Sequence, residues 1–136
     1  MINLERLILL GGILHFGILL ASALVPRVLD WKRTLGKLDR LSRQVVWVHG
    51  AFIVLVIIGF GLLSVVFADQ LAAGTPLARG VCLFIGLFWG ARLVLQLFVI
   101  DAREHLASPL LKIGYYALTV VFLYHTVVYS LAAIQI

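Results

Sequence analysis

Three ionisable side chains, His15, Arg92 and His125, lie deep inside otherwise apolar stretches of this chain. Ionisable groups are costly in the hydrocarbon of a bilayer, so they usually face a protein interior and often mark a functional site. Two histidines at similar depth on different helices are also the arrangement that holds a haem iron through axial imidazoles. The sequence therefore predicts that His15 and His125 are metal ligands to haem b or a related redox cofactor held between helices.

Arg92 and Tyr129 complete the predicted cofactor-binding set. Arg92 would neutralise a haem propionate, and Tyr129 follows His125 by four residues, on the same face of a helix. Such a protein would serve electron transfer or porphyrin or quinone chemistry. Alternatively, Arg92, His125 and Tyr129 would bind the oxygen atoms of a quinone, a prenyl lipid or another small amphipathic molecule.

A third interpretation is structural. Arg92 would then bond backbone carbonyls and the histidines would bond across helices, in a non-enzymatic accessory or assembly subunit of a larger membrane complex. The residues alone leave these three alternatives open, and with them the question of whether the protein is an enzyme.

Four long apolar stretches must position these side chains, at residues 7–25, 45–68, 81–100 and 113–136. At 1.5 Å per residue, each is long enough to cross the roughly 30 Å hydrocarbon core of a bilayer. Hydrophobic residues make up 63% of the chain and charged residues 12%, half the share of about 25% in soluble domains. Short connections favour antiparallel neighbours. We predict one all-α domain over residues 1–136, an integral membrane four-helix up-down bundle.

The positions along these stretches predict one polar layer. Counted from the inner boundary at 1.5 Å per residue, His15, Arg92 and His125 lie at heights of roughly 17, 12 and 18 Å. Gly86 and Gly90 form a G-x-x-x-G pattern in the third stretch. Small residues let helices approach closely in lipid, so this pattern predicts tight packing of that helix against a neighbour.

The connection at residues 26–44 is basic, with six Lys or Arg residues against Asp30 and Asp39, a net charge of +4. Basic short loops stay in the cytoplasm. This predicts a multi-pass protein of the inner (plasma) membrane with both termini outside the cytoplasm and the 101–112 connection inside. Apolar residues recur every three to four positions, as in an amphipathic helix with Trp31 at headgroup depth that anionic lipid would attract. Nothing else in the chain favours a nucleic-acid partner.

Several classes of function lack the residues that they need. No Asp or Glu lies within the four stretches, which argues against proton-coupled transport and against a hydrolytic triad at depth. Cys82 is the only cysteine, so an internal disulfide is excluded, and no H-E-x-x-H pattern is present.

Two short patches carry a family resemblance. The first stretch has Leu14-His15 at its middle and Val25-Pro26-Arg27 at its end, and the third contains Trp89-Gly90-Ala91-Arg92-Leu93. They resemble the small bacterial four-span haem proteins of the HemJ-like protoporphyrinogen oxidase and copper-resistance D-like group. The resemblance implies that His15 ligates haem and that Arg92 stands where that family has lysine. The chain departs from the family pattern in a shorter histidine-to-proline spacing, and His125 has no counterpart there.

Overall fold

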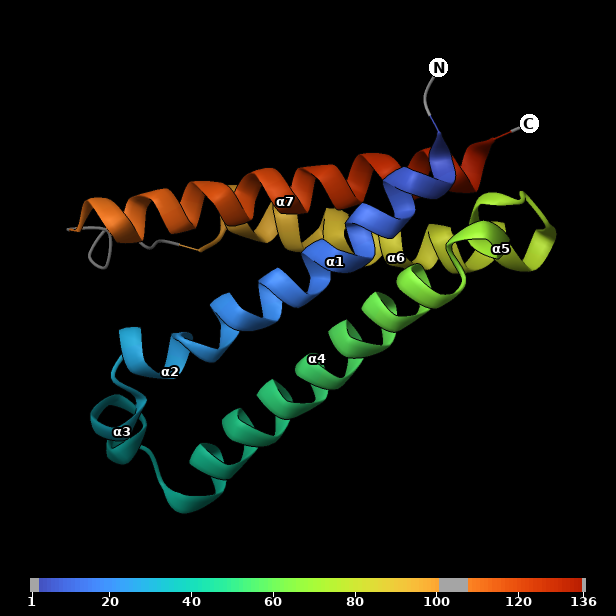
Figure 1. The fold of residues 1–136 in the computed structure, drawn as a ribbon. Coiled ribbons are helices and arrows are strands. Elements are labelled where there is room, and N and C mark those ends of the chain that lie inside the picture. Colours follow the sequence, from blue (N-terminus) through green and yellow to red (C-terminus); the bar gives the residue numbers. More distant parts are fainter. Residues whose placement is uncertain (1–2, 101–107, 136) are drawn as a thin grey trace.

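The computed structural model describes residues 3–100 and 108–135, and these ranges are almost entirely helical, without strands. Each long helix is long enough and apolar enough to cross a membrane. The all-α prediction is therefore confirmed, and the described helices overlap all four apolar stretches. They are α1 (Leu4–Ala23), α4 (Arg40–Val66), α6 (Pro76–Phe98) and α7 (Pro109–Ile134) (Figure 1).

Three of the long helices begin at a residue whose side-chain oxygen accepts a backbone N–H of the first turn. Asn3 precedes α1, Thr75 precedes α6 and Ser108 precedes α7. Such caps satisfy amide groups that have no partner within the helix. Pro76 and Pro109 then occupy the first helical position, where no amide hydrogen is needed.

The basic connection is divided into short turns rather than one amphipathic helix. It contains α2 (Val25–Val28), α3 (Trp31–Thr34) and the 3₁₀ turn η1 (Leu35–Lys37). Asp30 separates α2 from α3, because its φ of 51° is in the left-handed region and cannot continue a right-handed helix. At the other end of the molecule, α5 (Ala68–Ala72) leads from α4 towards α6.

The long helices pack in two close pairs, α1 with α4 and α6 with α7, and α1 also contacts α7 (Figure 1). Glycines allow these approaches. A Cβ on Gly12 of α1 would lie 3.0 Å from the carbonyl oxygen of Gly61 on α4. Gly86 and Gly90 face Ser130 and Thr126 of α7, where a Cβ would lie 3.1 and 3.4 Å from the nearest side-chain atom. The predicted close packing of the third apolar stretch is confirmed.

The two pairs separate towards the end that carries α2 and α3 (Figure 1). The buried residues of α4 all lie in its second half, from Ile57 to Ser64. In its first half, apolar side chains such as Trp47 and Phe52 are at least half exposed. The polar groups that α4 shares with the other helices are therefore found near its second half.

Candidate functional site

His15 of α1 and His125 of α7 lie face to face in the interior. Their ring centroids are 4.1 Å apart, the ring planes differ by 27°, and both side chains are 0% exposed. Gly11 makes room for this contact, because a Cβ there would lie 3.0 Å from the Tyr129 hydroxyl and 3.5 Å from the His125 ring. The structure thus brings together the two histidines and the tyrosine that the sequence singled out.

Three of the four imidazole nitrogens have hydrogen-bond partners. His15 Nδ1 and His125 Nε2 lie 2.7 and 2.9 Å from the same acceptor, the Gly11 carbonyl oxygen, so both nitrogens donate. Trp89 Nε1 of α6 donates to His15 Nε2 at 2.8 Å. Because an indole N–H can only donate, His15 is the tautomer that carries its proton on Nδ1. Among the described residues, His125 Nδ1 is the buried side-chain polar atom that has no partner.

Tyr129 extends this network to α4. Its buried hydroxyl forms a hydrogen bond with Ser64, which is also 0% exposed. The tyrosine ring lies 5.9 Å from the His15 ring and 5.8 Å from the His125 ring. We call the set that joins all four long helices the histidine cluster. It consists of Gly11, His15, Ser64, Trp89, His125 and Tyr129.

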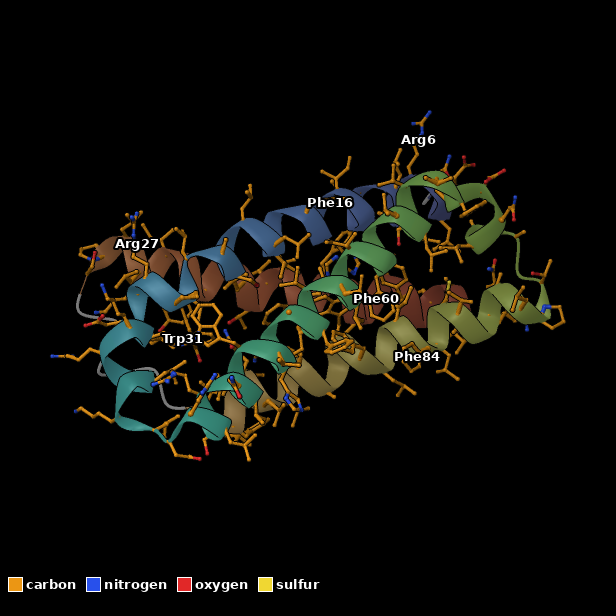
Figure 2. All side chains as sticks on the ribbon, turned by 90° about the horizontal axis from the view of Figure 1, so that it is seen from below. Arg6, Phe16, Arg27, Trp31, Phe60 and Phe84 are labelled. Atoms are coloured by element: carbon orange, nitrogen blue, oxygen red, sulfur yellow. The ribbon has the colours of Figure 1, made fainter. Side chains whose placement is uncertain are left out.

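Aromatic side chains enclose the histidine cluster. Phe122 of α7 stacks on Trp89, with centroids 5.2 Å apart and planes 19° apart. Phe60 of α4 meets the His15 ring edge-on at 6.0 Å and also contacts Phe84 of α6 (Figure 2). Such edge-on and offset pairs are favourable beyond the area that they bury. The cluster is therefore a closed, packed part of the core.

Arg92 lies outside the histidine cluster, in a second polar network shared by α6 and α7. Its Nη1 donates to Gln96 Oε1 at 3.2 Å, and its guanidinium lies over the Phe122 ring, 5.1 Å from the centroid. Gln96 in turn donates to Thr119, and the Tyr115 hydroxyl donates to the Gln96 carbonyl. Trp89, three residues before Arg92 on α6, takes the position beside the histidines.

Among the described residues, the Arg92 network contains no acid. In residues 3–100 and 108–135 the one ion pair joins Arg33 and Asp30, in the basic connection. Helices α4, α6 and α7 contain no Asp or Glu. Within the same ranges, no group of three or more His, Cys, Asp or Glu side chains is arranged to hold a metal ion. The predictions for the 101–112 connection fall mostly on residues 101–107, outside the described ranges.

The histidine cluster does not fit a haem held between His15 and His125. Two axial imidazoles must each direct a nitrogen at the iron from opposite faces of the macrocycle. Here the two ring faces stack in van der Waals contact, and both nitrogens of His15 are hydrogen-bonded. The described contacts of Arg92 are with Gln96 and Phe122. A haem would require the two helices to separate and these bonds to break.

Sequence reasoning missed the roles of Ser64 and Trp89. A buried indole or serine hydroxyl needs a hydrogen-bond partner, and this rule marks both residues as candidates for cross-helix bonds. It does not say which neighbour they bond to, because that depends on how each helix is rotated. Comparison with protein families, characterised proteins and solved structures gives no match to this chain.

Proposed function

We propose that this protein is a non-enzymatic accessory subunit of a larger membrane complex, and that an intramembrane carboxylate of its partner pairs with Arg92. The observation that carries the proposal is the position of Arg92 on α6. Its guanidinium is partly buried and has no acidic partner among the described residues. The histidine cluster, in this proposal, fixes how the four helices pack.

Membrane insertion as a four-helix up-down bundle is part of the proposal. The first half of α4 exposes many apolar side chains. Exposing them to water would be unfavourable, whereas contact with lipid would not. Arg27 and Trp31 lie at one end of the molecule and Arg6 at the other (Figure 2). The end with Arg27 and Trp31 carries the basic connection, and short basic loops stay in the cytoplasm. We therefore place both termini outside the cytoplasm, in an inner (plasma) membrane.

The histidine cluster supports a structural role because its polar groups bond mostly to one another. Trp89 donates to His15, two histidine nitrogens share the Gly11 carbonyl, and Tyr129 bonds to Ser64. A buried polar network whose members are satisfied rigidifies a core and specifies one packing. The remaining nitrogen, His125 Nδ1, has no partner among the described residues, but its side chain is 0% exposed and so closed to a substrate.

Arg92 has an energetic reason to seek an acid from outside the chain. It lies six residues before the last residue of α6, about 9 Å along the axis. Insertion of an arginine near the centre of a span costs about 2.5–3.5 kcal/mol. The contact with Phe122 offsets about 0.5–2 kcal/mol of that cost, and the bond to Gln96 is to a neutral acceptor. A carboxylate on a partner helix would satisfy the remaining donors.

Native electrophoresis of membranes dissolved in a mild detergent tests the proposal. Wild-type protein is expected in a complex well above its 15.0 kDa chain mass. Arg92→Leu is expected to release the free subunit, whereas Arg92→Lys, which keeps the charge, is expected to retain the complex. Arg6→Leu is the matched control, since Arg6 lies on α1, at the end of the molecule away from Arg27 and Trp31 (Figure 2), and not on α6.

Two results would overturn the proposal. One is a wild-type protein that migrates alone, and the other is an Arg92→Leu complex of undiminished size. The circular dichroism melt of each purified variant distinguishes loss of the partner from loss of folding. Arg92→Gln provides a second neutral variant that still bonds to neighbouring polar groups, and it should behave like Arg92→Leu.

A further inference from the structure

We propose that a basic pocket between α2, α3 and the start of α4 binds the phosphate headgroup of an anionic phospholipid. The pocket has a volume of about 540 Å³. It is lined by three cations and two tryptophans together with Pro26, Asp30 and Gly36. The lining residues that the argument uses are Arg27, Trp31, Lys32, Arg43 and Trp47.

The charges of the basic pocket suit a phosphate group. Arg27, Lys32 and Arg43 bring three positive charges to the lining, and Asp30 is its one carboxylate. Asp30 is paired with Arg33, which lies outside the lining, at 3.3 Å. Guanidinium groups match the oxygens of a phosphate in two-point contacts. The three lining cations are thus available to an anion.

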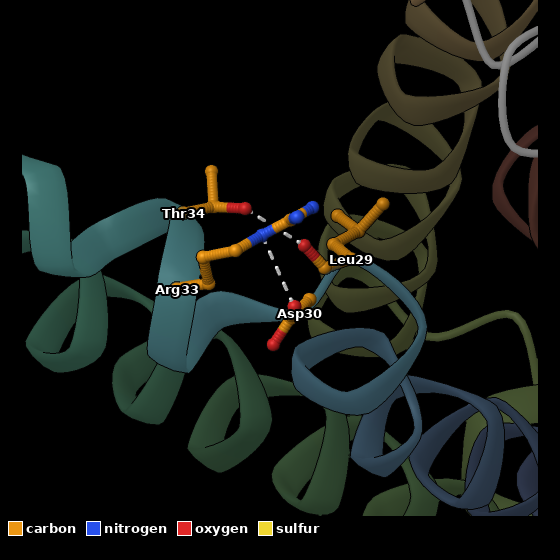
Figure 3. Close-up of polar contacts among 4 residues, drawn as sticks. All are labelled: Leu29, Asp30, Arg33 and Thr34. Atoms are coloured by element: carbon orange, nitrogen blue, oxygen red, sulfur yellow. Dashed lines mark hydrogen bonds and ion pairs between the residues drawn. The ribbon is translucent and has the colours of Figure 1, made fainter.

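A tight turn of the chain shapes the pocket. Asp30 takes a left-handed conformation between α2 and α3, with φ 51°. The Thr34 hydroxyl donates to the Leu29 carbonyl at 3.0 Å, and the Arg33–Asp30 ion pair spans the same turn (Figure 3). A left-handed residue other than glycine persists only where neighbouring contacts hold it. These contacts hold the turn between α2 and α3, the two elements that contribute Arg27 and Lys32 to the pocket. Arg43 and Trp47 form the side of the pocket that belongs to α4.

Two tryptophans point to a lipid rather than to a free ion. Trp31 and Trp47 meet edge to face, with centroids 5.0 Å apart and planes at 85°. Tryptophan is typical of the level of lipid headgroups, where its ring is apolar and its N–H is hydrated. The pocket volume lies within the range of sites for small organic molecules, about 300–1,000 Å³. The exposed apolar side chains Val48 and Phe52 continue from it along α4, where acyl chains would lie.

This inference rests on the membrane insertion in the proposed function but not on the pairing of Arg92 with a partner, because Arg92 and the basic pocket lie on different helices. The experiment uses the whole protein in detergent and native mass spectrometry to count bound lipid. The probes are dioctanoyl phosphatidic acid, phosphatidylglycerol and phosphatidylcholine, with inorganic phosphate as a competitor. The two anionic lipids are expected to bind about tenfold or more tightly than the zwitterionic one.

A pair of double variants separates a pocket from diffuse attraction. Arg27→Gln with Arg43→Gln removes two lining charges, whereas Lys37→Gln with Arg40→Gln removes two charges of the same connection that lie outside the lining. We expect the first pair to weaken anionic lipid binding about tenfold more than the second. Lys32→Gln, a single change at an exposed side chain, repeats the test if the first pair melts at a lower temperature.

Three results would overturn the inference. Equal losses in the two double variants would mean that anionic lipid is attracted by the net charge alone. Displacement of lipid by inorganic phosphate at equal concentration would mean that the site takes a soluble phosphate. Binding of phosphatidylcholine as tightly as phosphatidic acid would mean that the cations contribute nothing.

Discussion

The hydrogen bond between Ser64 and Tyr129 offers the sharpest test of the histidine cluster, because it alone ties α4 to α7 through polar groups in the described contacts. Both side chains are 0% exposed. Ser64→Ala or Tyr129→Phe each leaves one buried hydroxyl without its partner, at a cost of about 1–3 kcal/mol. The double variant leaves neither, so its cost should be smaller than the sum of the two.

The expected coupling can be stated as a number. Hydrogen bonds between membrane helices, measured by double-mutant cycles, average about 0.6 kcal/mol and reach about 1.7 kcal/mol. We therefore expect the four proteins of the cycle to show a coupling of about 0.6–1.7 kcal/mol, roughly a three- to eighteen-fold change in the unfolding equilibrium. Reversible unfolding in bicelles, followed by circular dichroism or steric trapping, measures the four free energies.

A control cycle uses Ser22→Ala with Tyr129→Phe. Ser22 lies on α1, about two turns beyond His15, and has no side-chain hydrogen bond in the described contacts. Its effect should add to that of Tyr129→Phe within about 0.3–0.5 kcal/mol. If the Ser64 cycle is as additive as the control, the two hydroxyls do not bond and the cluster does not include α4.

Three further predictions follow from particular contacts. Gly12→Ala should lower the free energy of unfolding by about 1–3 kcal/mol, because its Cβ would lie 3.0 Å from a backbone oxygen of α4. Gly17 has open space around it, so Gly17→Ala should not lower the free energy of unfolding in this way. Equal effects of the two substitutions would refute the close approach of α1 and α4. The Ser42 hydroxyl lowers the pKa of the exposed Asp39 carboxyl, which lies ahead of α4. The ionised carboxylate therefore stabilises the folded state above the unfolded-state pKa, and this stabilisation is lost as the pH falls through the lower folded-state pKa. Ser42→Ala should raise the Asp39 pKa in a carbon-13 NMR titration, and an unchanged pKa would contradict that cause. Oxidised and dithionite-reduced absorbance spectra of protein made with ample haem should lack a Soret band, whereas a band lost in His15→Ala would restore the haem hypothesis.

The elements that carry the site were predictable because one physical requirement dominates them. A single apolar stretch that crosses a bilayer must be helical, because only in a helix do its backbone N–H and C=O groups form hydrogen bonds within the segment. The rise per residue then gives the height of each side chain, which is why His15 and His125 were expected at one level. Their contact in the structure agrees with that expectation.

The rotation of each helix was not predictable. Arg92 and Trp89 are three residues apart on α6, and the helix is apolar on most sides, so the sequence does not say which of them faces the histidines. The structure gives that place to Trp89, whose N–H meets His15. Arg92 is placed one turn along, over Phe122. Because of this difference, the residue predicted to pair with a haem propionate is instead a cation that has no acidic partner among the described residues.

The basic connection shows a different limit. Its apolar residues recur with helical spacing, yet the structure interrupts the helix at Asp30. Periodicity is weak evidence over so few turns, because short helices in water are marginal and tertiary contacts decide them. The contacts of Trp31 with Trp47 and of Thr34 with Leu29 favour the turn over a continuous helix.

The measurement that bears most directly on the central claim is a photo-crosslink from α6. A photoreactive amino acid in place of Leu95, which is exposed and three residues beyond Arg92, would capture whatever lies beside the guanidinium in the intact membrane. We predict capture of an apolar span that carries an Asp or Glu, and release of the complex when that acid is replaced by its amide. Capture of lipid alone, or of a span without an acid, would contradict the account.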